Sequence, residues 1–231
     1  MKRFYKEAAA MSVPGGFGVA LDARPVKTPL KAPLIVPSKG LARAIAAEWA
    51  AQGEVIGREA MRLTRLACTA LDRVPNHRDA MLDEVIGYGA TDLICYRAER
   101  PASLIERQSI AWDPLLQWLN ATHGAMLAVT RGISPVEQPP EAVTALRGAA
   151  EQLDAFRLTA LHLAAGASGS LVIGLAVLAG RLDGEAAFQA SQIDEAFQIE
   201  QWGVDAEFEA RRAVLRADLE AAAEAVRLLN E

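Results

Sequence analysis

The stretch from Leu158 to Gly180 contains 23 consecutive residues without a formal charge. A run of this length could cross a membrane as one helix. It is interrupted, however, by the sequence GASGS at 166–170, and clusters of Gly and Ser end helices. Each half is then only about three helical turns long. The sequence therefore predicts two buried helices joined at a Gly/Ser break, and no membrane span.

The composition favours helices elsewhere in the chain. Apolar residues make up 52% of the 231 residues, whereas aromatic residues make up only 6%. Alanine supplies much of the apolar fraction, and alanine is the best helix former. The length fits one large domain or two small ones. We expect an α+β protein that is mainly α.

The N-terminal region is the exception, because residues 17–36 have the pattern of β-strands. Phe17, Val19 and Leu21 alternate with small residues, and DARP at 22–25 supplies turn chemistry. Prolines at 29, 33 and 37 exclude a helix here. Ser38 can then cap a helix that runs to Gln52 and stops at Gly53. Residues 1–53 are predicted to form a small β-containing domain with one helix.

The remaining residues, 54–231, are predicted to form a larger helical domain. An extended piece, MLAVT at 126–130, suggests a short strand, and SPVEQPP at 134–140 suggests a linker. The apolar spacing predicts helices over 59–73, 77–88, 102–122, 140–152, 155–165, 169–179, 184–202 and 205–229.

Motifs for metal or cofactor chemistry are missing. Cys68 and Cys95 lie in separate elements without a CxxC spacing, so reduced thiols are expected. The three histidines are far apart, and His162 is predicted to be a hydrogen-bonded core residue. The chain has no GxSxG, P-loop or GxGxxG sequence. We therefore expect no metal, no cofactor and no nucleotide.

Charge is unevenly distributed along the chain. Residues 1–53 carry a net charge of +5 and residues 181–231 carry −7, within a total of −5. An acidic protein is a poor nucleic-acid binder, so nucleic acid is not an expected partner. The first residues, MKRFYKEAAAMS, resemble neither a secretory signal nor a transit peptide. We expect a cytoplasmic bacterial protein.

The sequence DEAFQIEQWGVDAE at 194–207, called here the acidic segment, contains five acids and no base. On a continuous helix over 184–202, Glu200 falls in the apolar stripe of Ala186, Ala190, Ile193 and Phe197. Phe188, Glu195, Ile199 and Trp202 fall on the opposite face. Two apolar faces with acids suggest a docking surface for another protein. The alternative is a solvated helix end, with Glu200 reaching water and Trp202 capping the core.

Several long strings resemble one known family, the assembly chaperones for the alpha subunit of the ATP synthase catalytic head (the ATP-twelve family). Together these strings extend nearly from end to end of the chain. Arg62 departs from the resemblance, because a proline is expected at this position. The strings are RFYK at 3–6, LDARPVKTPLKAPLIVPS at 21–38, LARAIAAEWAAQ at 41–52, LTRLACTALD at 63–72, TDLICYRAERP at 91–101, WDPLLQW at 112–118, GSLVIGLAV at 169–177 and FQIEQWG at 197–203.

The resemblance implies a non-enzymatic binding protein that keeps unassembled alpha subunits from aggregating until they pair with beta subunits. It implies a small β-containing domain followed by a helical one, and a location in the bacterial cytoplasm or, in eukaryotic relatives, the mitochondrial matrix. We also expect the protein to be a monomer. The resemblance also associates Trp49 and the acids around Trp202 with activity, and we choose Glu207 over Asp205. The predicted partner-binding residues are Trp49, Glu195, Phe197, Gln198, Glu200, Trp202, Gly203 and Glu207.

Two other functions remain open from the residues alone. One is a small hydrolase that uses Glu195, Glu200 or Asp205 as general acid and base. The other is a factor that binds or inserts into membranes through residues 158–180. For Trp49 a core position and a partner contact are both open, because it lies on the apolar stripe of its helix.

Overall fold

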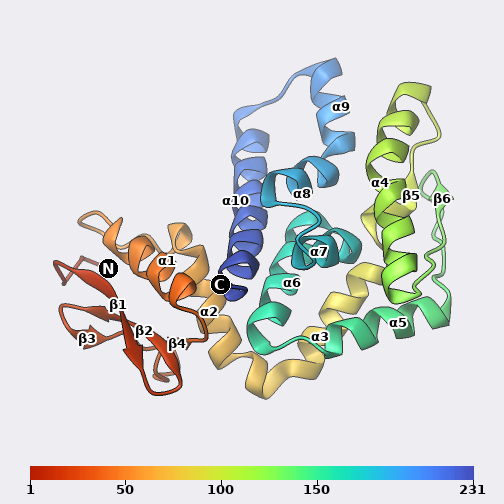
Figure 1. Ribbon diagram of the computed structural model, residues 1–231. Coiled ribbons are helices and arrows are strands. Elements are labelled where there is room, and N and C mark those ends of the chain that lie inside the picture. The colour runs from red at the N-terminus through yellow and green to blue at the C-terminus, as the bar shows by residue number, and fades with distance from the viewer. The chain divides into compact units, whose positions relative to one another are not determined.

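The computed structural model describes residues 1–231 and is α+β, mainly α, as predicted (Figure 1). The strands are β1 (Ala8–Val13), β2 (Gly16–Leu21), β3 (Arg24–Pro25), β4 (Ile35–Val36), β5 (Tyr96–Arg97) and β6 (Thr130–Arg131). The helices are α1 (Lys39–Ala50), α2 (Arg62–Asp72), α3 (Val74–Ala90), α4 (Ala102–His123), α5 (Pro140–Glu151), α6 (Ala155–Ser168), α7 (Leu171–Leu178), α8 (Gly184–Ser191), α9 (Ile193–Trp202) and α10 (Ala206–Leu229), with short 3-10 turns at Arg58–Ala60 and Leu93–Cys95.

The chain divides into two compact units. The first unit comprises residues 1–78, 154–160 and 224–231, and the second comprises 79–153 and 161–223. The domain boundary at residue 53 stays a prediction, because compactness alone does not define an independently folding domain.

The first unit is built around a small antiparallel sheet and one helix that packs against it. The central strand β2 pairs with β1, β3 and β4. Helix α1 packs against β1 and β2, where Val19 and Leu21 of the sheet and Ile45 of the helix are all buried. Burying such side chains stabilises the unit by about 1.5–3 kcal/mol each. The strand β1, an alanine-rich segment, was not predicted.

The DARP turn joins β2 to β3 as the sequence suggested. Asp22 and Ala23 have φ of 47° and 65°, the left-handed conformation that a tight hairpin requires. The Asp22 carboxylate also accepts hydrogen bonds from the backbone N–H groups of Lys6 and Glu7, at 3.0 and 2.9 Å. These bonds attach the segment before β1 to the turn and lower the pKa of Asp22.

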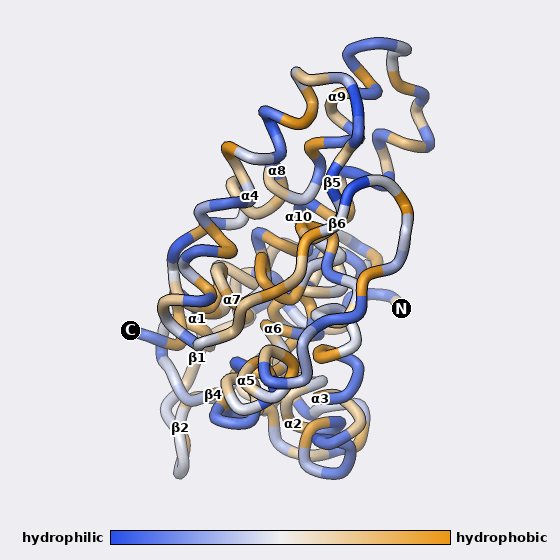
Figure 2. Tube along the Cα trace, turned by 90° about the vertical axis from the view of Figure 1, so that its right-hand side faces the viewer, coloured by the Kyte–Doolittle hydropathy of each residue, from blue (hydrophilic) through white to orange (hydrophobic).

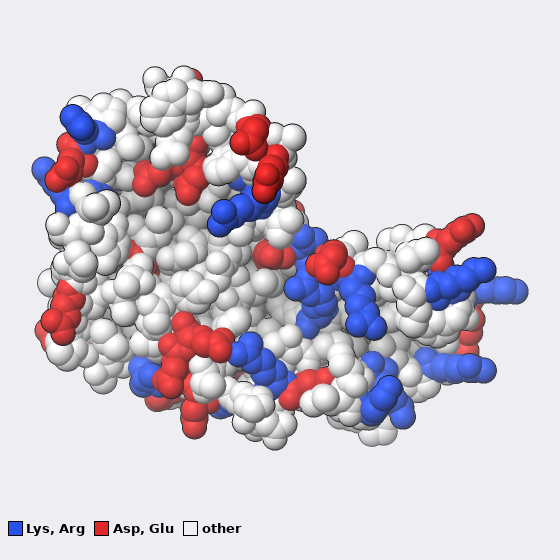
Figure 3. Space-filling model, turned by 180° about the vertical axis from the view of Figure 1, so that it is seen from behind, with Lys and Arg blue, Asp and Glu red and all other residues white.

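The exposed surface of the first unit is basic. Figure 3 shows its Lys and Arg side chains in blue, at the right of the picture. The exposed basic residues before α2 include Lys2, Lys6, Arg24, Lys27, Lys31, Lys39 and Arg43.

Helix α7 is the core of the second unit. Residues Leu171 to Val177 are all buried, and the tube along this helix has mostly hydrophobic colours (Figure 2). The predicted Gly/Ser break is confirmed: Gly169 has φ 71°, and the Ser170 hydroxyl caps α7 by accepting a hydrogen bond from the N–H of Ile173 at 3.0 Å. None of the helices combines the length and the hydropathy needed to span a bilayer.

The prediction of one continuous helix over 184–202 is wrong. Gln192 has φ −116° and ψ 23°, and it separates α8 from α9. The Ser191 hydroxyl donates to the Phe188 carbonyl at 2.9 Å, while the buried Gln192 side chain accepts from Nε of Arg212 at 3.3 Å. A side-chain bond to a backbone carbonyl, such as that of Ser191, competes with the hydrogen bonds of a helix.

Other predicted boundaries also shift. Of the strand expected at 126–130 only Thr130 is in a strand, because β6 comprises Thr130–Arg131 and pairs in parallel with β5. Ala128 is instead held by Gln138, which hydrogen-bonds its N–H and its carbonyl at 2.8 and 3.1 Å. The helix predicted from residue 59 begins at Arg62, and α3 begins before residue 77 with a kink at His77.

Candidate partner-binding surface

Helix α9 carries most of the acidic segment. It begins after Gln192 and ends at Gly203, whose φ of 79° stops the helix. Asp194 and Glu195 occupy its first turn, where negative charge interacts favourably with the helix dipole. None of its residues is fully buried, so every side chain of α9 is at least partly exposed to solvent.

Glu200 forms an ion pair with Arg107 of α4. Arg107 Nη1 lies 2.7 Å from Glu200 Oε1, and the two side chains are 46% and 49% exposed. The same guanidinium group lies over the ring of Phe197, 5.4 Å from its centroid. The hydrogen bond from Arg107 holds the pKa of Glu200 below its ordinary value. Glu200 is therefore an exposed residue whose carboxylate pairs with Arg107, on the same side of α9 as Phe197.

Trp202 is the most exposed aromatic residue in this region. Its side chain is 80% exposed and is followed by Val204, which is 45% exposed. Gln198, Gly203 and Glu207 are exposed as well. The reading in which Trp202 caps the core is thus wrong, because a core cap would be covered.

The two faces predicted for a continuous helix do not exist. Phe188, expected on the same face as Trp202, is only 3% exposed. The break at Gln192 changes the direction of the chain, so positions in α8 do not align with those in α9. Only the residues after the break, from Ile193 onward, share one helix.

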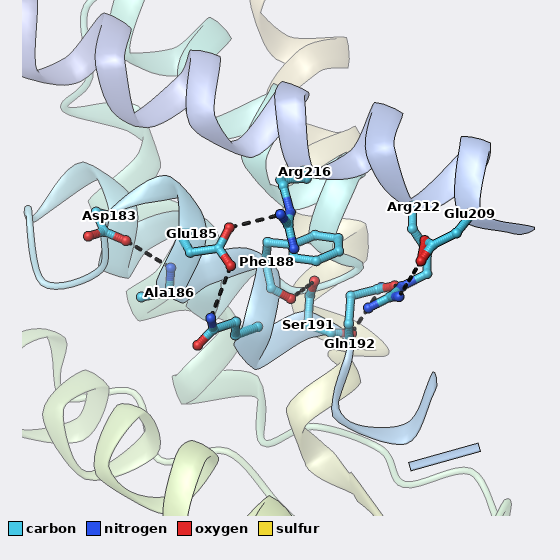
Figure 4. A network of polar contacts seen from close by, with 10 residues as sticks. Asp183, Glu185, Ala186, Phe188, Ser191, Gln192, Glu209, Arg212 and Arg216 are labelled. Atoms are coloured by element: carbon cyan, nitrogen blue, oxygen red, sulfur yellow. Dashed lines mark hydrogen bonds and ion pairs between the residues drawn. The ribbon is translucent and has the colours of Figure 1, made fainter. Parts of the chain in front are cut away.

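Two arginines of α10 cover Phe188 (Figure 4). The guanidinium carbon of Arg216 lies 4.6 Å from the centroid of the Phe188 ring, and that of Arg212 lies 5.4 Å from it. Glu185 contacts Arg216 at 3.3 Å and Glu209 contacts Arg212 at 3.4 Å. Stacking of guanidinium groups on an aromatic face is favourable by about 0.5–2 kcal/mol.

A groove that the sequence did not reveal lies between α4, α8, α9 and α10. It has a volume of about 540 Å³ and includes the arginines just described together with Arg107. Its residues come from positions 107 to 216, and no short motif contains them, so nothing in the sequence pattern identified it.

Trp49 belongs to the first unit, whereas the other predicted site residues belong to the second. It is partly buried, with its ring edge-to-face against Tyr5 at 5.7 Å. The Tyr5 hydroxyl donates to the Trp49 carbonyl at 2.7 Å. The Trp49 Nε1 atom is buried without a hydrogen-bond partner. These contacts give Trp49 a packing role, and whether it also contacts a partner stays a prediction.

The remaining candidates for catalysis or metal binding, Glu195, Asp205 and His162, have separate structural roles. Burial raises the pKa of Glu195, and Asp205 caps α10 by accepting from the N–H of Phe208 at 2.8 Å. His162 is hydrogen-bonded, as predicted, to Glu84 at 2.7 Å, but it is 28% exposed and not in the core. No group of three or more His, Cys, Asp or Glu residues is arranged to hold a metal ion.

Comparison with known proteins shows which family has this combination of a small sheet unit and a helical unit. A family model described as ATP12 chaperone protein matches residues 2–120. The crystal structure of Atp12 from Paracoccus denitrificans superposes with a TM-score of 0.90, at 42% identity over 99% of this chain and 98% of that chain. A variant of the Paracoccus protein, with one aspartate replaced by lysine, superposes equally well over 99% and 97%.

A eukaryotic relative is also similar. The mitochondrial atp12 protein of Schizosaccharomyces pombe is 24% identical over 214 residues, which cover 87% of this chain and 74% of that protein. The protein therefore belongs to the class of assembly chaperones. The chain belongs to the ATP12 family, the chaperones of ATP synthase assembly.

Proposed function

We propose that this protein binds the unassembled alpha subunit of the ATP synthase catalytic head and prevents its aggregation until the alpha subunit pairs with beta. One observation carries the proposal: in a member of the ATP12 family, Trp202 is 80% exposed at the end of the acidic helix α9. An exposed tryptophan next to charged residues is typical of a protein-binding hot spot.

The physical basis is the temporary covering of a subunit interface. An unassembled ring subunit exposes the apolar surface that it later buries, and such a surface aggregates. A chaperone must cover this surface tightly enough to compete with aggregation, yet release it to a larger native interface. The carboxylates of Glu200 and Glu207 add charge selectivity to the contact of Trp202. No bond is broken in this exchange, so no catalytic group is required.

The hydrolase alternative fits these residues less well. General acid catalysis needs a carboxyl group whose pKa is raised toward neutrality. Burial raises the pKa of Glu195, but Arg107 lowers the pKa of Glu200. Glu195 and Glu200 lie five residues apart on one helix, so they point in different directions from its axis. The Asp205 carboxylate caps a helix.

We expect the protein to act as a monomer in the compartment where the synthase head is assembled, which is the cytoplasm in bacteria.

Co-expression with the alpha subunit tests the proposal. The soluble fraction of alpha is measured with the wild type, with Glu200→Lys and with Trp202→Ala. Asp83→Lys is the matched control, because Asp83 also forms an exposed ion pair with an arginine, Arg147, at 2.5 Å. We expect soluble alpha with the wild type and the control, and aggregated alpha with the other two. The proposal is wrong if alpha is equally insoluble with and without the wild-type protein.

A further inference from the structure

Residues 23–47, called here the basic stretch, contain five bases and no acid. The bases are Arg24, Lys27, Lys31, Lys39 and Arg43, and all five are exposed. The charge of Arg24 acts on the nearby Asp22. The other four take part in none of the ion pairs of the structure. Their positive charge is therefore not neutralised by contacts within the protein.

The two units of the chain carry opposite charge. The first unit has fifteen Lys and Arg against nine Asp and Glu, a net charge of +6, and the second has nine against twenty, a net charge of −11. Lys and Arg side chains predominate on the side of the first unit that Figure 3 shows. Although the protein as a whole is acidic, its first unit attracts anions.

A well-held turn places Leu30 at a tip within the basic stretch. The N–H of Lys31 donates to the Thr28 carbonyl at 2.9 Å and closes the turn. Asp72 of α2 holds it from below: its two carboxylate oxygens accept from the Thr28 hydroxyl at 2.6 Å and from the N–H of Leu30 at 3.0 Å. Because the turn is already ordered, binding through its tip costs little conformational entropy.

The tip of this turn is apolar. The Leu30 side chain is 68% exposed, and Pro29 beside it is exposed as well. Lys27 and Lys31 lie on either side of the tip in the sequence. The apolar stem of a lysine lies along an apolar surface while its ammonium group stays in a polar layer. An apolar tip between two lysines thus fits the boundary between the headgroups and the acyl chains of a lipid bilayer.

The N-terminal edge of the same unit has a similar combination. Phe4 is 61% exposed and Val55 is 67% exposed. Lys2, which forms an antiparallel bridge with Val55, and Lys6 are exposed too. All five lysines of the chain lie between positions 2 and 39, and every other base is an arginine. Since protein interfaces are enriched in arginine and depleted in lysine, these lysines favour a lipid surface over a protein partner.

We propose that the first unit binds reversibly to the surface of a lipid bilayer that contains anionic phospholipids. Leu30 and Pro29 enter the boundary below the headgroups, and Lys27 and Lys31 contact the lipid phosphates. The other bases of the unit add long-range attraction, which several charges must supply together. The same lipid charge repels the second unit, so the acidic segment with Trp202 stays available to a protein partner.

The test measures how much full-length protein sediments with vesicles of phosphatidylcholine alone, and with vesicles of phosphatidylcholine and phosphatidylglycerol in equal parts. One variant combines Lys27→Glu with Lys31→Glu. A second variant, Leu30→Ala, shortens the apolar tip and keeps every charge. Circular dichroism melting establishes that each variant is folded.

Two controls in the second unit match these changes. Arg100→Glu combined with Arg131→Glu alters the net charge by the same amount at two exposed bases. Ile133→Ala shortens an aliphatic side chain that is 97% exposed.

We expect the wild type to bind the mixed vesicles and not those of phosphatidylcholine alone, with binding that weakens as salt is added. The double lysine variant should bind at least about tenfold more weakly, and Leu30→Ala at least about threefold more weakly. Both controls should stay within about twofold of the wild type.

The inference is overturned if the wild type stays in solution with the mixed vesicles, or if both folded variants bind as tightly as the wild type. It is also overturned if the arginine control loses as much binding as the lysine variant, because net charge alone would then be responsible. A lysine variant that binds vesicles normally but no longer keeps alpha soluble would assign the turn to the protein partner instead. The vesicle test contains no alpha subunit, so its failure leaves the proposed function standing.

Discussion

Arg107 Nη1 lies 2.7 Å from Glu200 Oε1, although 93 positions separate the two residues. This ion pair connects α4 to the last turn of α9, and the Arg107 guanidinium also covers the ring of Phe197. It therefore connects the acidic segment to the groove that α4, α8, α9 and α10 line.

Exchanging the two charges should reveal how Glu200 acts. Glu200→Arg and Arg107→Glu should each weaken the suppression of alpha aggregation, because each leaves like charges facing one another. The double variant restores opposite charges and should recover part of the lost activity. Aggregation assays on all four proteins give the coupling between the two positions. A folded double variant no better than Glu200→Arg would mean that the ion pair with Arg107 contributes nothing to activity and that Glu200 acts only through its contact with the partner.

Asp92 should make the stability of the protein depend on pH. It is fully buried and accepts hydrogen bonds from the N–H groups of Ile94 and Val172. Burial raises its pKa from 3.8 to about 6, so the folded state binds this proton more tightly than the unfolded state. The contribution of Asp92 to the free energy of unfolding is therefore greatest below its ordinary pKa and falls as pH rises to about 6, by at most about 3 kcal/mol.

Urea unfolding from about pH 4 to pH 8 measures this contribution. Asp92→Asn cannot titrate, so the difference in free energy between wild type and variant should change over the interval in which Asp92 loses its proton. Asp79→Asn, at an exposed position, is the control. A difference that stays constant over the whole pH range would show that the pKa of Asp92 is not raised.

Substitutions of Trp49 should distinguish packing from partner contact. Trp49→Ala removes the edge-to-face contact with Tyr5 and should lower the free energy of unfolding by about 2–4 kcal/mol. Trp49→Phe keeps an aromatic ring and removes the buried Nε1–H that has no partner, so its cost should be under about 1 kcal/mol. Chemical denaturation measures both. If Trp49→Phe is as stable as the wild type but no longer holds alpha, Trp49 is a contact residue.

Gly184 should tolerate no side chain, because α8 approaches the backbone of α10 there. A Cβ atom at Gly184 would meet the Cα atom of Glu220 and would lie 2.8 Å from its nitrogen. We expect Gly184→Ala to destabilise the protein by about 1–3 kcal/mol. Gly148→Ala, in α5 with no atom within 4 Å of the added Cβ, should instead stabilise it by about 0.5–1 kcal/mol. Thermal melting compares the two, and equal effects would contradict the close approach.

Local sequence signals predicted much of the fold. The alternation at Phe17, Val19 and Leu21 predicted β2, and the Gly/Ser sequence predicted the break between two helices, although α6 continues to Ser168 and α7 begins only at Leu171. These signals succeed because turn geometry and side-chain periodicity act between residues close in the chain. The alanines of β1 would favour a helix on their own, and pairing with β2 makes them a strand.

The acidic segment shows what local sequence signals do not predict. Its composition, with Trp202 and five acids, could be read directly from the sequence. That Phe188 is buried while Trp202 is exposed, however, goes with the break at Gln192, which no local pattern indicated. The buried Gln192 contacts Arg212, 20 positions further along the chain.

The sequence by itself therefore determined the α+β class, the buried helices α6 and α7, and the membership of the ATP12 family that its long strings indicated. Only the tertiary structure decided that Glu200 pairs with Arg107 and that three arginines line one groove. The physical reason is distance along the chain: these contacts join residues from separate helices, and their energies exist only after the helices have packed together.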